Sequence, residues 1–239
     1  MSREGVRVSL PEELAERLLG AIIDGTHPPG VALPSESELA EQFSVSRLTV
    51  REAVKALRVQ NVVRIQRGRG TYVNPPAQWT ALDPMIRAAT APRSSRVVSE
   101  SLIDARRLLE VGAAELAAVK RTATDLAQLR EQLQDMQSAA DTDDVELFVA
   151  ADIAFHNTVM QATGNAFIPL MFEPFGRLLV EGRRETSSVR EIRANAIEHH
   201  TKILHALEAG DPVTARQAMI DHLAQTSEDL RTHVIDKRP

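Results

Sequence analysis

Apolar residues recur at helical spacing along most of the chain, and turn residues separate the segments. In the first segment Leu14, Leu18 and Ile22 repeat every four residues. Ser9 stands three residues before Glu12, the spacing of a capping box, and a glycine at position 25 follows the last apolar repeat. This combination predicts a helix that begins after the serine and ends before the glycine.

Two further helices are predicted close behind the first. Ser35 and Glu38 form a second capping-box pattern, which predicts a short helix through Phe43. Ser46, at the end of a tight turn, is the expected N-cap of a third helix that ends near Val59. A short helix, a tight turn and a longer helix are the order of elements in a helix-turn-helix.

A small hairpin is predicted directly after the third helix. Two strand-like stretches, 62–65 and 71–73, are joined by residues 66–70, whose glycines permit the positive φ of a hairpin tip. A hairpin in this position is the wing of a winged helix-turn-helix. We therefore expect residues 1–74 to form a winged helix-turn-helix DNA-binding domain.

The rest of the chain divides into a linker and a helical domain. Residues 75–96 hold four of the twelve prolines, which favours a linker. Residues 97–239 show helical spacing throughout, so we expect an all-α helical bundle there and a mainly α protein overall. The predicted helices of the bundle are 97–120, 123–140, 143–163, 166–183, 188–209 and 212–234.

Composition excludes several classes of protein. The sequence is 43% hydrophobic and 26% charged, which is typical of soluble globular proteins, and no apolar run approaches the length of a membrane span. No apolar secretory signal is seen at the N-terminus. The chain has no cysteine, which excludes disulfides, thiol catalysis and cysteine-ligated zinc. We expect a cytoplasmic protein.

Basic residues are concentrated where the helix-turn-helix is predicted. Residues 43–73 hold seven basic side chains and one acidic one, although the whole chain carries a net charge of −5. On the third helix an apolar stripe, expected to be buried, lies beside a basic stripe formed by Arg47, Arg51, Lys55 and Arg58. Taken alone, a basic stripe is more often a solvated face. Here it coincides with the helix-turn-helix and a basic wing, which indicates a partner such as double-stranded DNA.

Four polar residues of the helical domain stand at positions expected to be buried. Asp152 and His156 are four residues apart on a helix that is apolar nearly all round. His200 and His222 lie on the apolar sides of two later helices. One carboxylate and three imidazoles would suit a divalent transition metal. From the spacing alone, four unrelated core residues remain an alternative.

The N-terminal motifs resemble the GntR family of winged-helix regulators. The resemblance runs through Pro29-Gly30, Leu33-Pro34-Ser35-Glu36, Val45-Ser46-Arg47, Val50-Arg51-Glu52-Ala53 and Arg67-Gly68-Arg69-Gly70-Thr71-Tyr72-Val73. It implies that the recognition helix and the wing contact the operator through Ser46, Arg47, Thr49, Arg51, Arg67 and Gly68. Family members usually have arginine where this chain has Ser37, so the resemblance implies a different operator.

The C-terminal motifs resemble the all-helical effector domain of the FadR branch of this family. These motifs are Arg106-x-x-Leu109-Glu110, Asp152-x-x-Phe155-His156, His200-x-x-Ile203-Leu204 and Ala218-Met219-x-x-His222-Leu223. The resemblance implies a metal held by Asp152, His156, His200 and His222, with zinc expected, and a small acid that completes the metal's shell. Arg106 is expected to bind the acid's carboxylate; the alternative is a structural pair with Glu110 on its own helix.

Two functions from different classes follow from these features. The first is a homodimeric transcription regulator whose affinity for a palindromic operator is controlled by a sugar acid or another small carboxylate. The alternative is a metalloenzyme domain fused to a DNA-binding module. No nucleophile motif is present, and no acidic residue other than Asp152 stands out as a general base. We therefore expect a regulator and no enzyme.

Overall fold

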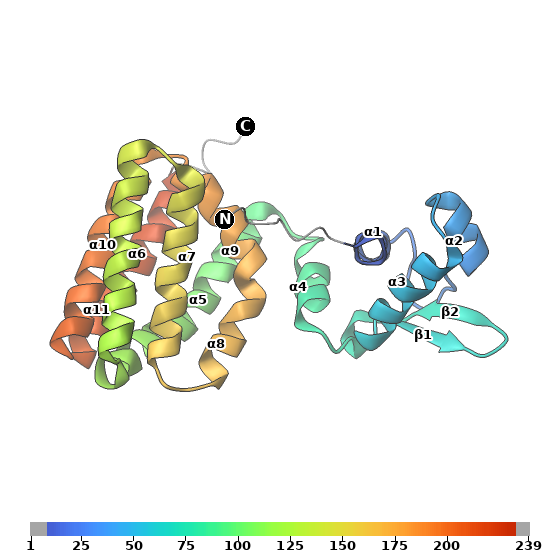
Figure 1. Cartoon of the computed structure of the whole chain (residues 1–239), viewed down its shortest axis with the longest axis horizontal. Coiled ribbons are helices and arrows are strands. Elements are labelled where there is room, and N and C mark those ends of the chain that lie inside the picture. Colours follow the sequence, from blue (N-terminus) through green and yellow to red (C-terminus); the bar gives the residue numbers. More distant parts are fainter. Residues whose placement is uncertain (1–8, 233–239) are drawn as a thin grey trace, which may run out of the picture. The chain divides into compact units, whose positions relative to one another are not determined.

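The computed structural model describes residues 9–232, apart from the side chains of Arg177 and Glu181. The described chain forms two compact units, with the boundary between Ser94 and Ser95. Each unit has its own hydrophobic core. The predicted fold class is confirmed: the N-terminal unit holds a helix-turn-helix with a small sheet, and the C-terminal unit is helical (Figure 1).

The N-terminal unit contains the three helices, the hairpin and one further helix. Both predicted capping boxes are present, at Ser9 with Glu12 and at Ser35 with Glu38. Ser46 caps the third helix, as the sequence predicts. The elements are α1 (Leu10–Ile23), α2 (Glu36–Gln42), α3 (Arg47–Val59), β1 (Val63–Gln66), β2 (Gly70–Val73), the 3-10 helix η1 (Pro76–Gln78) and α4 (Leu82–Thr90).

Strands β1 and β2 form an antiparallel hairpin. Val63 pairs with Val73 at its base, and Gln66 pairs with Gly70 next to the tip. Ala32 adds an isolated bridge to Tyr72, so the segment before α2 lies against the outer edge of β2. The base of the hairpin is buried against the helices, and its tip points away from them (Figure 1).

The segment predicted as a linker contains ordered elements. Trp79 is buried in the core of the N-terminal unit, and its Nε1 donates to the carbonyl oxygen of Asn74 at 3.0 Å. Helix α4 follows and packs against α1, with Arg87 paired to Glu16 at 2.8 Å. Pro84 is the third residue of α4, where a missing N–H breaks no helical hydrogen bond. The range 75–96 that the sequence predicts as a linker therefore contains η1 and α4.

The C-terminal unit is built of long helices that pack side by side (Figure 1). Five of them form a closed ring of neighbours in the order α5, α7, α6, α10, α11 and back to α5. Their bounds, with those of the shorter helices, are α5 (Ser95–Lys120), α6 (Ala123–Thr142), α7 (Val145–Ala162), α8 (Phe167–Phe172), η2 (Glu173–Phe175), α9 (Gly176–Ser187), α10 (Arg190–Ala209) and α11 (Pro212–Leu230).

One predicted helix of this unit is broken. The sequence pattern predicted a continuous helix over 166–183, but the structure divides it into α8, η2 and α9. Pro174 lies in the break, where its ring excludes a regular helical hydrogen bond. Helix α9 then packs on α7 and α10, which brings its last turns close to the centre of the bundle.

Among the described residues, no helix is both long and apolar enough to cross a membrane.

Candidate functional site

Helix α3 presents a basic stripe to solvent. Its buried residues are Val50, Ala53, Val54 and Leu57, the stripe that the sequence predicts to be apolar and buried. The four basic residues of the neighbouring stripe are exposed. The helix can therefore lie against another molecule without disturbing its own packing, as a recognition helix must.

The start of α3 offers hydroxyl groups beside the first backbone N–H groups of the helix. Ser46 Oγ accepts from the N–H of Thr49 at 3.0 Å and lies 2.8 Å from Thr49 Oγ1. Ser46 and Arg47 are exposed, and Thr49 is partly exposed. A helix N-terminus attracts anions such as phosphate. The three side chains thus lie where a phosphate group would be bound.

Two basic residues of α3 form weak surface pairs. Arg51 lies 3.1 Å from Glu36 on α2, and Lys55 lies 3.2 Å from Glu52. All four side chains are largely exposed, with 63% of the Arg51 side chain accessible. Exposed pairs of this kind contribute about 0–1 kcal/mol, so they can open when a polyanion is bound.

The tip of the hairpin is a second basic surface. Arg67, Gly68 and Arg69 are exposed, and Gly68 has a φ of +72°, which a residue with a side chain adopts only with strain. Arg64, by contrast, is directed to its own unit: its Nη1 donates to Asn74 Oδ1 at 2.5 Å. Arg67 and Arg69 are therefore accessible to a partner, whereas Arg64 is hydrogen-bonded within its own unit.

A cluster of charged and imidazole side chains is buried in the C-terminal unit. It contains seven residues, each no more than 8% exposed, from five helices: Arg106 and Glu110 on α5, Asp152 and His156 on α7, Arg183 on α9, His200 on α10 and His222 on α11. Burial of so many polar groups is costly unless partners compensate. The bonds within this cluster therefore bear on its function.

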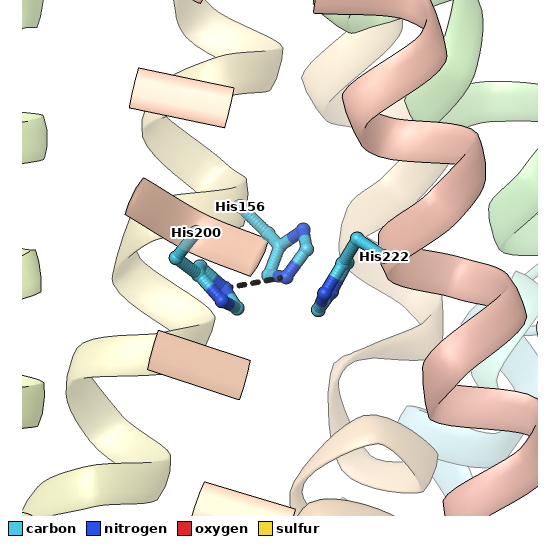
Figure 2. Close-up of side chains that lie close together, drawn as sticks. All are labelled: His156, His200 and His222. Atoms are coloured by element: carbon cyan, nitrogen blue, oxygen red, sulfur yellow. Dashed lines mark hydrogen bonds between the residues drawn. The ribbon is translucent and has the colours of Figure 1, made fainter. Parts of the chain in front are cut away.

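Three histidines meet at the centre of the cluster. His156, His200 and His222 come from three different helices and point toward one another (Figure 2). Each contributes one ring nitrogen to a group in which all three atoms lie within 4.8 Å of one another. His156 Nε2 and His200 Nε2 are 3.2 Å apart. The structure thus brings together the three histidines that the sequence analysis singled out.

Backbone and side-chain acceptors fix the tautomers of two of these rings. His200 Nδ1 lies 2.6 Å from the carbonyl oxygen of Ala196, and His156 Nδ1 lies 2.6 Å from Glu110 Oε2. Because a carbonyl oxygen only accepts, His200 Nδ1 carries a proton. The Glu110 carboxylate favours a proton on His156 Nδ1 as well, although this contact is an ion pair and lacks the geometry of a hydrogen bond. In the neutral rings each Nε2 then presents a lone pair, and the two lone pairs face each other across the 3.2 Å gap.

Asp152 and His222 add further lone pairs to the same point. Asp152 Oδ1 is 3.1 Å from His200 Nε2 and 3.9 Å from His156 Nε2. Within the described residues, His222 Nε2 is buried without a hydrogen-bond partner. Two ligands of one zinc ion, each at ~2.0–2.2 Å from it, lie roughly 3–3.5 Å apart. The two shortest separations, 3.1 and 3.2 Å, match this value, and the 3.9 Å separation would have to shorten around an ion. The kinds of donor suit a divalent metal ion.

Electrostatics keep these groups in the protonation states that bind metals. Burial lowers the pKa of His156 to about 4, although the Glu110 carboxylate acts in the opposite direction. Burial and the other imidazoles hold the pKa of His222 well below its usual value. Burial raises the pKa of Asp152, but Arg183 and His200 outweigh it, so its pKa is lowered. At neutral pH His156 and His222 are therefore uncharged, and Asp152 is ionised.

Arg106 forms the structural pair that the sequence analysis named as the alternative to effector binding. Its Nε donates to Glu110 Oε1 at 2.6 Å, the structural pair along its own helix. It also lines a pocket next to the histidines, where a ligand could reach it. Its expected role in effector binding stays a prediction.

Arg183 is a member of the cluster that sequence reasoning missed. Its Nε lies 2.5 Å from Asp152 Oδ2, and it lines the same pocket. The two residues are far apart in sequence, and α9 gave no periodic signal that would single out this arginine. His199 also lines the pocket, half-buried, but it does not belong to the metal-ligating group.

Two family models match the chain. The model of the gntR family of bacterial regulatory proteins matches residues 10–73, and the FCD domain model matches residues 101–225. The first therefore covers the helix-turn-helix and wing, and the second covers most of the helical bundle that contains the buried cluster.

Individual relatives match both units together. The chain is 34% identical to the HTH-type transcriptional regulator LutR of Bacillus subtilis, over 87% of this chain and 95% of that protein. It is 29% identical to the galactonate operon transcriptional repressor of Escherichia coli, over 88% and 92% respectively. The solved structure of Lar, which controls the agr system of Listeria monocytogenes, has the same fold, with a TM-score of 0.67, 20% identity and coverage of 96% of this chain and all of that one.

Proposed function

Because the chain belongs to the gntR family of bacterial regulatory proteins and carries an FCD domain, it is a DNA-binding transcription regulator, and we propose that a small organic acid bound beside a metal ion controls its affinity for DNA. Its relatives are named as regulators of transcription. The expectation that the chain is no enzyme is confirmed, and the metalloenzyme alternative is set aside.

The convergence of lone pairs in the buried cluster carries the proposal of a metal. Asp152, His156, His200 and His222 would be the ligands, with zinc as the expected ion. A cation between His156 Nε2 and His200 Nε2 would relieve the contact of two acceptors, and it would give His222 Nε2 a partner. The Glu110 and Ala196 oxygens contact Nδ1 of His156 and His200, the ring nitrogens that would not bind the metal, and so orient the two rings. Such contacts are usual around metal-bound histidines.

The pocket beside the cluster supports an organic acid as the effector. It measures about 480 Å³ with its open mouth included, and Arg106, Asp152, Arg183 and His222 are among its lining residues. The guanidinium groups of the two arginines suit the carboxylate of a small acid. Bound there, a metal ion would supply a positive charge that attracts a carboxylate oxygen.

The N-terminal domain is proposed to contact DNA through its helix and its wing. Arg47 and Arg51 lie on the exposed stripe of α3, Ser46 and Thr49 at its start, and Arg67 and Gly68 at the hairpin tip. Arginine forks suit guanine edges and phosphates, and the hydroxyls suit phosphates. We assign operator binding to residues 1–74, and effector binding and dimerisation to residues 97–239. A dimer would read a palindromic operator.

Control of DNA binding follows from linkage. If the acid binds one arrangement of the regulator more tightly than another, the affinity for the operator must change by the same factor. The residues that bind the acid and the residues that bind DNA therefore need no direct contact.

Selection of DNA by the full-length, zinc-loaded protein tests this function. Duplexes bound from a random library should converge on a palindrome, and Arg47→Ala should weaken binding of the selected duplex by about 1–3 kcal/mol if it reads a base. Arg107→Ala, an exposed arginine of α5, is the control and should leave binding unchanged. A library that converges on no sequence, or affinity that is unaffected by small acids in the zinc-loaded protein, would contradict the proposal.

A further inference from the structure

Leu48 is an exposed apolar residue in the first turn of α3. It is the second residue of the helix, and 65% of it is exposed. Single exposed leucines are common on protein surfaces and need no explanation. Leu48 differs from them in its place, because its neighbours Arg47 and Thr49 belong to the surface that is proposed to contact DNA. Its surroundings, rather than its exposure, indicate a function.

The periodicity of α3 gives the direction of this side chain. At about 100° per residue, Leu48 lies about 160° round the helix from Val50, which is fully buried in the apolar stripe. The Leu48 side chain thus points away from the core of the N-terminal unit. By the same periodicity, Thr49 lies on one side of Leu48, and Arg47 and Arg51 lie on the other.

Four exposed residues share this outermost line of α3, which we call its crest: Leu48, Glu52, Lys55 and Val59. Glu52 and Lys55 are paired with each other at 3.2 Å. Val59 is the last residue of the helix, about 16 Å from Leu48 along the axis. Leu48 is therefore the crest residue of the first turn.

The shape of the DNA major groove decides which residues of a helix meet the bases. The groove is about 12 Å wide and admits one α-helix, so the flanks of that helix lie beside the two rows of phosphates. The base edges form the floor of the groove and face the crest, and recognition helices contact them with their N-terminal residues. The arginines and the hydroxyl group beside Leu48 suit phosphates. Leu48 itself would then lie against a base edge.

The chemistry of leucine selects its partner on the floor of the groove. Most groups there are hydrogen-bond donors or acceptors, and it is unfavourable to bury one of them against an alkyl side chain. The C5-methyl group of thymine is the apolar group that the base pairs present in the major groove. Contact between this methyl group and leucine removes apolar surface of both from water.

We propose that Leu48 selects thymine in each half of the operator through contact with the C5-methyl group of that base. The inference rests on the proposed function, in which α3 enters the major groove. It adds an apolar contact to the polar contacts that are assigned to the same helix. At this position of the operator, the methyl group itself should carry the discrimination.

Replacement of thymine by deoxyuridine in the selected duplex tests the inference on the unaltered, zinc-loaded protein. Deoxyuridine pairs as thymine does and lacks only the methyl group. Each thymine is replaced in turn, together with its equivalent in the other half-site, and the dissociation constants are compared. At one position the replacement should weaken binding roughly fourfold for each methyl group lost, the effect of one buried carbon. A selected duplex without thymine in its half-sites, or no loss at any thymine, would overturn the inference.

Two variants test whether Leu48 makes this contact. Leu48→Ala shortens an exposed side chain, so its thermal unfolding should match the wild type, and it should bind the thymine and deoxyuridine duplexes nearly equally at that position. Val59→Ala is the matched control, since Val59 is 74% exposed on the crest at the other end of α3. It should keep the full preference for thymine. If Leu48→Ala keeps that preference as well, another residue contacts the methyl group and the proposal is wrong.

The same titrations distinguish failure of this inference from failure of the proposed function. A protein that selects a palindrome and is weakened by Arg47→Ala, but binds thymine and deoxyuridine duplexes equally, would refute only the inference. A library that converges on no sequence would refute the function and the inference together.

Discussion

His199 and His200 are neighbours on α10, and the helix turns their side chains about 100° apart. His200 is fully buried and meets His156 and His222, whereas His199 is half-buried at the pocket. Only His200 has a backbone acceptor, the Ala196 oxygen, that orients its ring toward the cluster. The two residues therefore form a natural pair for substitution.

His200→Ala should remove the metal, and His199→Ala should keep it. Elemental analysis of the purified protein should give about one metal ion per chain in the wild type and in His199→Ala, and little in His200→Ala. If His199→Ala empties the site and His200→Ala does not, the ligand assignment is wrong. If the wild type holds no metal, the proposed centre does not exist.

The pair of Arg106 and Glu110 is buried almost completely, with 4% and 0% of the residues exposed. Glu110→Ala should destabilise the metal-free protein by about 3–5 kcal/mol, because it leaves the Arg106 charge buried without its partner. Urea unfolding measures this loss. The double substitution Arg106→Met with Glu110→Leu should recover much of the stability; a double variant as unstable as Glu110→Ala would contradict this account.

The buried cluster could be predicted from sequence only where its residues share a helix or a motif. Asp152 and His156 are one turn apart, and Arg106 and Glu110 likewise, so helical spacing revealed both pairs. Arg183 follows no such rule. Its partner Asp152 lies on another helix, and only the packing of α9 on α7 brings the two together.

At the scale of elements, α2 and α3 are joined by the exposed pair of Glu36 and Arg51. Glu36→Gln should increase affinity for duplex DNA several-fold and steepen its dependence on salt, because Arg51 is released and a negative charge is removed beside the phosphates. Glu41→Gln makes the same charge change at an exposed position of α2 and should have a smaller effect. Titrations of duplex DNA with each variant at two or more salt concentrations measure both the affinity and its dependence on salt. Weaker binding by Glu36→Gln would show that the pair positions Arg51 for DNA.

Prolines explain where the predicted elements differ from the observed ones. Pro84 suggested a linker, but it lies in the first turn of α4, which tolerates proline. Pro174 lies within the predicted helix 166–183, where it breaks the helix between α8 and α9. Capping boxes, by contrast, marked α1 and α2 correctly because their hydrogen bonds are local. The effect of a proline depends on its place in a helix, which the surrounding chain decides.

At the scale of the whole molecule, the compact N-terminal unit extends to Ser94. A fragment of residues 1–94 should therefore fold cooperatively, and a fragment of residues 1–74 should be less stable by about 3–5 kcal/mol, because it lacks the buried Trp79. Denaturant unfolding of both fragments measures the difference. Equal stability would place the end of the domain at residue 74, as the sequence suggested, and make the packing of Trp79 and α4 dispensable.

The proposed metal ligands also bear on how the chain unfolds. His156 and His200 are 44 residues apart, His222 lies on a further helix, and the chain has no cysteine with which to form a covalent cross-link. An ion held by all three would close loops that the unfolded chain otherwise leaves open, and so remove part of its conformational entropy. For this protein the ion would do what disulfides do in secreted domains, with one difference: a chelator could undo it.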